Sequence, residues 1–221
     1  MSTPMKIDFV SDVSCPWCVI GLLALEQALE QALATMPELT AEIEFQPFEL
    51  NPAMAPEGQD IAEHLTEKYG ASPEQAAATR EAIRQRGADL GFNFEMGARS
   101  RIYNTFDAHR LLHWAYEQSP AQQRALKMAL FTAYFTDGLD PSSHAVLLNA
   151  ATAVGLDAAG AQAVLASDRY TAEVRAAQAL YRQHGINAVP AVIINNKHLI
   201  SGGQPVEVFA QALRQIAAEA A

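Results

Sequence analysis

The pattern of apolar positions predicts two sheet-forming ends around a helical middle. Residues 6–10 alternate polar and apolar side chains, as a half-buried strand does. From Pro16 to about Met36 the apolar residues recur at helical spacing. Residues 42–46 then alternate again. The beginning of the chain therefore predicts strand, helix and strand, with a crossover long enough for the two strands to be parallel.

The middle of the chain predicts a series of helices. Each begins at a capping side chain or a proline, and most end near a glycine. The predicted starts are Asp60, Ser72, Asn104 or Thr105, Ser119, Ser142 or Ser143, and Asp157; the predicted ends lie near Gly70, Gly91, Tyr116, Gly138 and Gly155.

The end of the chain returns to sheet-forming sequence. A helix is predicted from about Asp168 to His184, followed by a β-rich run over 189–194. A tight turn at 195–196 leads into 198–200 as a hairpin, and a helix closes the chain. Both ends are needed to complete one sheet. We therefore predict an α/β fold with a discontinuous domain, 1–54 and 168–221, interrupted by a large all-helical insertion, 55–167.

Composition narrows the classes of protein. Half of the 221 residues are hydrophobic and 18% are charged, which excludes a disordered chain. The net charge of −10 argues against a nucleic-acid partner. We find no run of 18 apolar residues and no basic segment leading into an apolar one. The sequence thus predicts no membrane span and a cytoplasmic location, where an isolated structural disulfide is unexpected.

The two cysteines form the sequence Cys15-Pro16-Trp17-Cys18 at a predicted strand-to-helix junction. The unpaired N–H groups and partial positive charge of a helix N-terminus favour a thiolate at Cys15. Cys18 lies one turn further in and is expected to be more buried and less acidic. The spacing puts both sulfurs on one face, so they can form a disulfide. This asymmetry is typical of a nucleophilic thiol and a resolving thiol.

Other interpretations of the cysteine pair remain open at this stage. Half of a zinc site needs two further ligands, and His109 and His113, four residues apart, could face one metal. Two inert buried thiols are the other alternative. We favour redox chemistry and predict no metal, because the chain has no second cysteine pair.

Several further residues have both a functional and a structural interpretation. Pro190 marks a sheet edge, a strand start or a special peptide bond. His109 either has a function, as a hydrogen-bonding partner of substrate or a stabiliser of the Cys15 thiolate, or is an ordinary histidine at a helix surface or core edge. Trp17 either offers an apolar surface to substrate or packs against the insertion. Asp12 would oppose thiolate formation, or simply cap its loop.

Several segments, spread in order over nearly the whole sequence, carry a family resemblance. They are residues 12–18 with Ile20-Gly21, residues 48–52, 104–110 and 133–135, Val189-Pro190, and residues 200–205. With these segments, the chain as a whole resembles the DsbA-like thioredoxin-fold family, in its FrnE-like branch.

The resemblance implies a thioredoxin-like fold in which Cys15 attacks, Cys18 resolves and Pro190 is cis. It also implies a groove between the helical insertion and the sheet. The residues that we expect to bind substrate there are Trp17, Asn51, Asn104, His109 and Val189.

Related families differ at the first cysteine. The 2-hydroxychromene-2-carboxylate isomerases and kappa-class glutathione transferases carry serine there, so cysteine at both positions favours disulfide exchange. Two smaller departures are Asn187-Ala188, where Thr-Gly is frequent, and Gly203, where alanine is frequent.

The sequence therefore predicts a thiol–disulfide oxidoreductase acting on disulfide-containing or thiol substrates. No resident cofactor is expected, although glutathione or another small thiol is allowed as co-substrate. A glutathione-dependent isomerase or transferase of small electrophiles, and a non-enzymatic holdase, are the alternatives. The sequence leaves both a monomer and a homodimer open.

Overall fold

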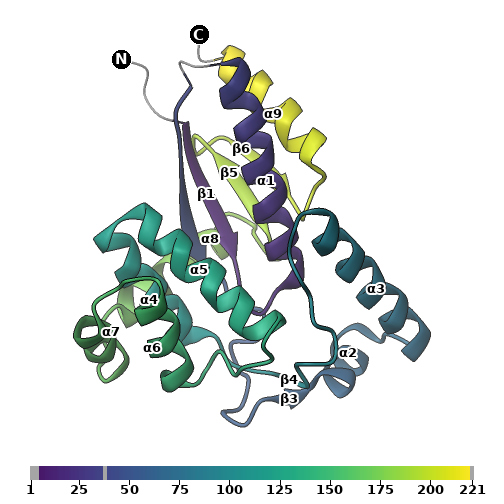
Figure 1. Ribbon diagram of the computed structural model, residues 1–221, viewed down its shortest axis with the longest axis vertical. Helices are drawn as coiled ribbons and strands as arrows, with labels where there is room; N and C mark the ends of the chain where they lie inside the picture. Colours follow the sequence, from purple (N-terminus) through teal and green to yellow (C-terminus); the bar gives the residue numbers. More distant parts are fainter. Residues whose placement is uncertain (1–4, 37–38, 220–221) are drawn as a thin grey trace.

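The computed structural model describes residues 5–36 and 39–219 and contains a four-stranded mixed sheet (Figure 1). The strand order is β2-β1-β5-β6, in which β1 is parallel to β2 and antiparallel to β5, and β6 is antiparallel to β5. The strands are β1 (Met5–Ser11), β2 (Ala41–Pro47), β5 (Ala191–Ile194) and β6 (His198–Ser201). The two ends of the chain thus build one sheet, as predicted.

Strand β1 is buried on both faces, which corrects the prediction of a half-buried strand. Ile7 and Phe9 belong to the main hydrophobic core, whereas Val10 belongs to a smaller core on the opposite face. Asp8 is only 3% exposed. Its carboxylate accepts a hydrogen bond from the Gln46 side chain at 3.0 Å and lies 3.4 Å from the Lys6 ammonium. These partners offset the cost of burying the charge, and alternation alone did not reveal them.

Helices α1 (Pro16–Thr35) and α9 (Val206–Glu219) pack together against one face of the sheet, and α8 (Thr171–Gln183) lies behind the opposite face (Figure 1). By length and composition alone, α1 could cross a membrane, but 56% of its most apolar window is buried inside the protein. A core helix passes the same test, because it too must be apolar nearly all round. The absence of a membrane span stays a prediction.

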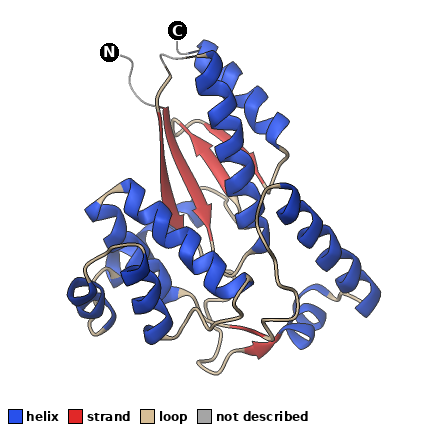
Figure 2. Cartoon of the chain, in the orientation of Figure 1, coloured by secondary structure: helices blue, strands red, loops and turns tan. Residues whose placement is uncertain are grey.

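The inserted segment is helical apart from one pair of short strands (Figure 2). Its helices are α2 (Ile61–Tyr69), α3 (Pro73–Asp89), α4 (Phe106–Gln118), α5 (Pro120–Phe135), α6 (His144–Ala153) and α7 (Ala158–Leu165). The strands β3 (Gln59–Asp60) and β4 (Arg101–Ile102) were not predicted, because two residues give no detectable period.

Capping residues set the helix boundaries close to their predicted positions. The Asp60 carboxylate accepts from the backbone N–H groups of Ala62 and Glu63 at the start of α2, and Gly70 ends that helix in the left-handed conformation. Ser72 forms a capping box with Gln75 at the start of α3. The largest departures are three residues: α8 begins at Thr171 rather than near Asp168, and α5 ends at Phe135 rather than near Gly138.

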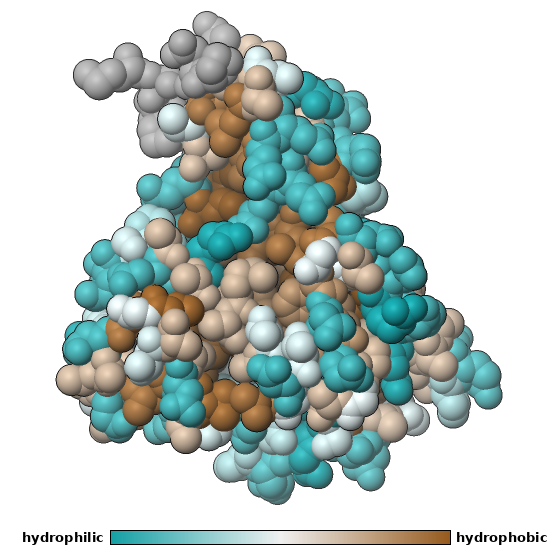
Figure 3. Space-filling view, in the orientation of Figure 1, coloured by the Kyte–Doolittle hydropathy of each residue, from teal (hydrophilic) through white to brown (hydrophobic). Residues whose placement is uncertain are grey.

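The insertion and the sheet share one hydrophobic core. Ile83 of α3 and Phe131 and Phe135 of α5 belong to the same cluster as Phe9, Cys15 and Cys18. Helices α4, α6 and α7 bury a second cluster together with Leu126 and Leu130 of α5 and Val13 of the cysteine loop. Figure 3 shows a hydrophobic band over the middle of the face that is turned toward the viewer in Figure 1, flanked by hydrophilic surface. The exact division at 54/55 and 167/168 stays a prediction.

Candidate functional site

Cys15 lies where β1 gives way to α1, in the position that the sequence predicts. It is the N-cap of α1 and Pro16 occupies the first turn, where a missing N–H costs nothing. The first turn holds no acidic side chain, so no carboxylate there competes with a Cys15 thiolate for the positive end of the helix dipole. Cys15 is only 4% exposed, but it is one of the residues that line an open cleft. Cys15 thus borders the cleft at the start of α1.

Cys18 is fully buried and differs from Cys15 as predicted. Burial, a hydrogen bond between the two thiols and the charge of Cys15 raise the pKa of Cys18 well above its ordinary value. Both cysteines are free thiols here. One sulfur therefore faces the cleft while the other keeps its proton behind it, which is the asymmetry that stepwise disulfide exchange requires.

Pro190 packs against the cysteine-bearing helix. Its peptide bond with Val189 is cis, as the family resemblance implies. The Cys15 thiol donates a long hydrogen bond of 3.7 Å to the Val189 carbonyl oxygen. On the other side, a Cβ added to Gly21 of α1 would lie 2.9 Å from Pro190 Cγ. The absence of a side chain at Gly21 therefore allows the proline ring to pack directly on α1, one turn beyond Cys18.

Asp12 joins the cysteine loop to the wall of the cleft. One carboxylate oxygen accepts from the Ser14 amide at 3.3 Å, and the other accepts from the Leu50 amide at 2.7 Å. Its Oδ1 also lies 3.5 Å from His109 Nε2. Burial alone would raise the pKa of Asp12, but His109 and the Leu50 amide hold that pKa below its ordinary value. Asp12 caps its loop, as one of the two sequence interpretations has it, and it also reaches Leu50.

The cleft has a volume of about 920 Å³ and lies between the cysteine loop, the segment before β5 and helices α2 and α3. Four of the predicted site residues line it, namely Cys15, Trp17, Asn51 and Val189. The size is that of a small-molecule or peptide site. The structure thus brings the predicted groove and half of the predicted residues together.

Trp17 lies between the cleft and the insertion. It lines the cleft, and it also packs against the insertion, because the Arg86 guanidinium of α3 lies 5.2 Å from its ring centre. Arg86 in addition donates to the Gly203 carbonyl at 2.7 Å. This arginine ties α3 to the residues around the cysteine motif.

His109 and Asn104 are not among the residues that line the cleft. His109 is 3% exposed and lies beside Asp12. The Asn104 side chain donates to Glu49 at 3.3 Å and accepts from the Phe106 amide at 2.9 Å. Both residues therefore support the wall of the cleft from behind.

Glu49 is a buried carboxylate of this wall that the sequence did not single out. It is 2% exposed and lines the cleft. It pairs with Arg175 and accepts from Gln178 at 3.0 Å. Because Glu49 has these partners as well as Asn104, its charge is neutralised inside the protein.

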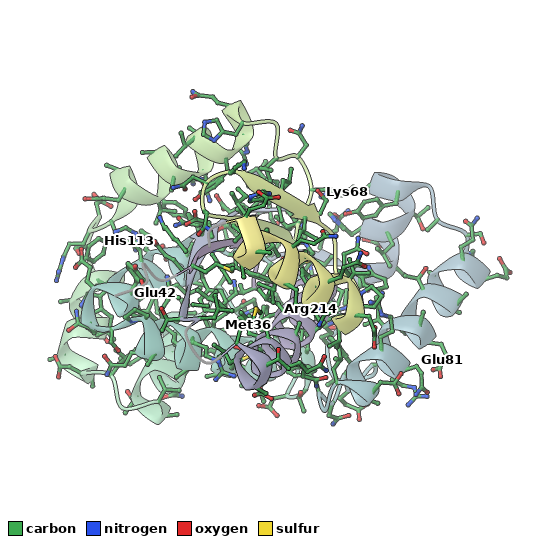
Figure 4. All side chains as sticks on the ribbon, turned by 90° about the horizontal axis from the view of Figure 1, so that it is seen from above. Met36, Glu42, Lys68, Glu81, His113 and Arg214 are labelled. Atoms are coloured by element: carbon green, nitrogen blue, oxygen red, sulfur yellow. The ribbon has the colours of Figure 1, made fainter. Side chains whose placement is uncertain are left out.

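Basic residues from three helices and one loop line the cleft. They are Lys68 of α2, Arg80 of α3, Arg99 before β4, and Arg182 of α8. Lys68 donates to the Leu50 carbonyl at 2.8 Å and to Asn51 at 2.7 Å, and Figure 4 shows it projecting from α2 toward the sheet half of the molecule. The protein has a net charge of −10, so this concentration of positive charge is local.

The remaining titratable groups of the cleft add little negative charge. Asp60 caps α2, and burial together with Lys68 lowers the pKa of His64, so His64 is neutral at pH 7. No local sequence pattern marks these four basic residues as a cluster, because they are far apart along the chain.

The two histidines considered as metal ligands do not converge. His109 faces Asp12, whereas His113 stacks on Tyr170 with ring centres 5.0 Å apart. Within residues 5–36 and 39–219, no group of three potential metal-ligating side chains comes together.

Comparisons with known proteins agree with this geometry. A family model described as a DSBA-like thioredoxin domain matches residues 6–214. A probable DsbA oxidoreductase from Streptomyces coelicolor is 36% identical, with a TM-score of 0.87 over 97% of this chain and 91% of that one.

Two more distant structures share the fold. A 2-hydroxychromene-2-carboxylate isomerase has a TM-score of 0.66 at 14% identity, over 97% of both chains. The cytosolic disulfide reductase DsbM from Pseudomonas aeruginosa, solved with GSH, has a TM-score of 0.62 at 15% identity, over 96% of this chain and 99% of that one. The thioredoxin-like fold and the family resemblance are thereby confirmed.

Proposed function

This chain belongs to the family of DSBA-like thioredoxin domains, and from that membership we propose that it is a thiol–disulfide oxidoreductase in which Cys15 attacks and Cys18 resolves. The family and the S. coelicolor relative indicate an oxidoreductase or a related isomerase. The observation that carries the proposal is the unequal pair of thiols. Cys15 starts a helix at the edge of the cleft, and Cys18 lies fully buried behind it.

The proposed reaction has two exchange steps. The Cys15 thiolate attacks one sulfur of a substrate disulfide, forms a mixed disulfide and releases the other sulfur as a thiolate. Cys18 then loses its proton and attacks Cys15 Sγ. The Cys15–Cys18 bond forms, the bond between Cys15 and substrate breaks, and the second substrate thiolate leaves with two electrons transferred in all. The reverse sequence oxidises a dithiol.

The mixed disulfide would lie against Val189. The Cys15 thiol points to the Val189 carbonyl, so a substrate bonded to Cys15 must enter along residues 187–189, which line the cleft. Trp17 supplies an apolar surface beside that path. Asp12 helps to hold the loop in place through Ser14 and the opposite wall through Leu50.

We propose glutathione, or another small anionic thiol, as co-substrate. Glutathione carries two carboxylates, and four basic side chains line the cleft with only a neutralised Glu49 and a helix-capping Asp60 against them. Carboxylates bind favourably to arginine and lysine in a partly enclosed cleft. DsbM, which was solved with GSH, has a similar fold. In a cytoplasmic setting, which we also propose, the glutathione pool would return the pair to its dithiol form.

A glutathione-dependent isomerase is the second candidate, since the fold is shared with 2-hydroxychromene-2-carboxylate isomerase. The two candidates differ in their need for Cys18. An isomerase or transferase uses only the thiol at the edge of the cleft, so Cys18→Ser would keep turnover of a small electrophile. Disulfide exchange needs both sulfurs, and Cys18→Ser would stop after the first step.

Reduction of insulin in the presence of reduced glutathione tests the proposal. We expect the wild-type protein to accelerate insulin precipitation, and Cys15→Ser to return the rate to that of glutathione alone. Ser14→Ala, a change in the same loop that removes no sulfur, is the matched control and is expected to keep most of the activity. Equal rates for wild type and Cys15→Ser would exclude the mechanism.

A further inference from the structure

Lys127 is a buried basic residue that has no part in the two proposed exchange steps. It lies on α5, and its side chain is fully excluded from solvent. Among the residues that the structure describes, its ammonium nitrogen has no hydrogen-bond partner. Natural proteins rarely leave a lysine in this state, because burial of an unpaired ammonium is costly.

The surroundings of Lys127 are the core beneath the cysteine pair. Its Nζ lies 5.1 Å from the ring centre of Phe131 and 5.9 Å from that of Phe45. Both rings belong to the hydrophobic cluster that contains Cys15 and Cys18. The aromatic faces give the ammonium a weak attraction, but they do not replace a hydrogen-bonding partner.

Three groups from two other segments oppose the cost of this burial. Desolvation lowers the pKa of Lys127 to about 8, while the charges of Cys18, Asp12 and Cys15 raise it. Cys15 and Cys18 lie on α1 or at its start, and Asp12 lies in the loop before it. His109 of α4 pairs with Asp12, and the neighbours of Lys127 on β2 and α5, Phe45 and Phe131, carry no charge. Two of the three groups that favour the ammonium are therefore the redox thiols.

We propose that Lys127 is the redox-linked charge of the cysteine pair: its ammonium stabilises the reduced pair, and it gives up its proton when the Cys15–Cys18 disulfide forms. This inference rests on the proposed disulfide exchange. In the reduced protein, a thiolate charge on either cysteine attracts the ammonium. In the disulfide, neither sulfur can carry a charge, and Lys127 keeps only Asp12, which His109 already partners.

The electrons and protons of the proposed step balance. The starting state holds a Cys15 thiolate, a Cys18 thiol and a Lys127 ammonium, together with a substrate disulfide. Two electrons reduce the substrate, and the two protons that its thiolates need come from Cys18 and Lys127. The products are the Cys15–Cys18 disulfide, a neutral amine and two substrate thiols. Lys127 touches no substrate, so it is a positioning residue that acts through its charge on the two sulfurs.

The direction of the effect on the reduction potential follows from the sign of the charge. A cation that stabilises the reduced pair makes the pair more oxidising. Lys127→Met keeps the length and apolar stem but removes the charge. The disulfide should then become easier to form, and the potential should become more negative.

Equilibration of the pair with glutathione redox buffers at pH 7 tests this inference. For Lys127→Met we expect the exchange constant to move at least tenfold toward the disulfide, which corresponds to about 30 mV or more. Lys197→Met is the matched control, because Lys197 is an exposed lysine whose nitrogen contacts only Glu219 among the described residues; it should stay within twofold of wild type. Lys127→Arg keeps a permanent charge, so its constant should not move toward the disulfide.

Each outcome bears on a distinct claim. A Lys127→Met constant within twofold of wild type would overturn the role of Lys127 while leaving disulfide exchange intact. If the variant is too unstable to measure, the pH dependence of the wild-type constant and of Lys127→Arg decides, because arginine cannot release the second proton. A dependence that is equally steep in both would also overturn the inference. A wild-type pair that forms no disulfide at any glutathione ratio would overturn the proposed function, and this inference with it.

Discussion

The Asp12 carboxylate lies 3.5 Å from the His109 imidazole, and both side chains are almost completely excluded from solvent. Asp12 sits three residues before Cys15, whereas His109 comes from α4 in the inserted helical segment. Their contact, together with the bond from the Leu50 amide to Asp12, fixes the cysteine loop against two distant parts of the chain. The insertion is thus structurally coupled to the redox centre.

Asp12→Asn is expected to destabilise the protein at pH 7 by about 1–3 kcal/mol, because a buried acceptor of two backbone N–H groups loses charge and one acceptor position. The folded state holds the pKa of Asp12 below its ordinary value. The carboxylate therefore stabilises the fold above pH 4, and this contribution is lost as the pH falls through the depressed pKa. Chemical denaturation between pH 3 and 7 measures the difference. The stabilities of wild type and Asp12→Asn should therefore converge as the pH falls. Glu81→Gln, on the outer side of α3 (Figure 4), is the control, and its stability should stay close to that of wild type throughout.

Gly21→Ala is expected to reduce both stability and disulfide exchange. The added Cβ would lie 2.9 Å from Pro190 Cγ and 3.3 Å from the Gly203 backbone, so the proline or α1 must move. Overpacking of this kind costs about 1–3 kcal/mol, although alanine is otherwise the better helix former. At Gly97 a Cβ would meet only a flexible Glu95 side chain at 3.8 Å. Gly97→Ala should leave the insulin assay unchanged, and equal behaviour of the two variants would contradict close packing at Pro190.

Arg80→Glu is expected to raise the KM for glutathione or an anionic disulfide by roughly three- to tenfold at low salt, with a smaller effect on kcat. The change reverses one of the four basic charges that line the cleft. Added salt should narrow the difference from wild type, because it screens partly exposed charges. Arg214→Glu, on an exposed position of α9, matches the change in net charge. An equal rise in KM for both variants would mean that net charge, and not the cleft, is responsible.

The burial of Lys127 predicts a pH dependence of stability in the alkaline range. The pKa of Lys127 is lowered from 10.5 to about 8 in the fold, which disfavours the folded state by on the order of 3 kcal/mol while the lysine is charged in both states. This penalty is fully present below pH 8 and is relieved as the pH rises from 8 toward 10.5. The free energy of unfolding of the reduced wild-type protein should therefore rise over that interval relative to that of Lys127→Met. Parallel curves for the two proteins would contradict the burial of an unpaired ammonium.

Local chemistry was predictable, and tertiary placement was not. Ser72 with Pro73, and Asp60 with Gly70, marked helix boundaries because caps act within one turn. The position of the cysteine motif at a helix start was predictable too, because it depends on the few residues around Pro16. By contrast, the contact of Asp12 with His109 and the gathering of Lys68, Arg80, Arg99 and Arg182 depend on how α2–α4 pack against the sheet.

The alternation of polar and apolar residues along a strand also does not show whether a helix covers the more polar face. Residues 6–10 alternate like a half-buried strand, yet α8 covers the face that holds Asp8 and Val10. No sequence pattern marks Lys127 as buried, and only the packing of α5 against Phe45 reveals its burial.

Trapping of the mixed disulfide tests the central claim most directly. Cys18→Ser, mixed with oxidised glutathione and examined by intact-mass spectrometry and peptide mapping, should accumulate one glutathione bonded to Cys15. Wild type should instead convert to the Cys15–Cys18 disulfide with little adduct, and Cys15→Ser should gain almost none because Cys18 is fully buried. An adduct that forms on Cys18 as readily as on Cys15, or no adduct on Cys15 at all, would contradict the division of roles between the two thiols.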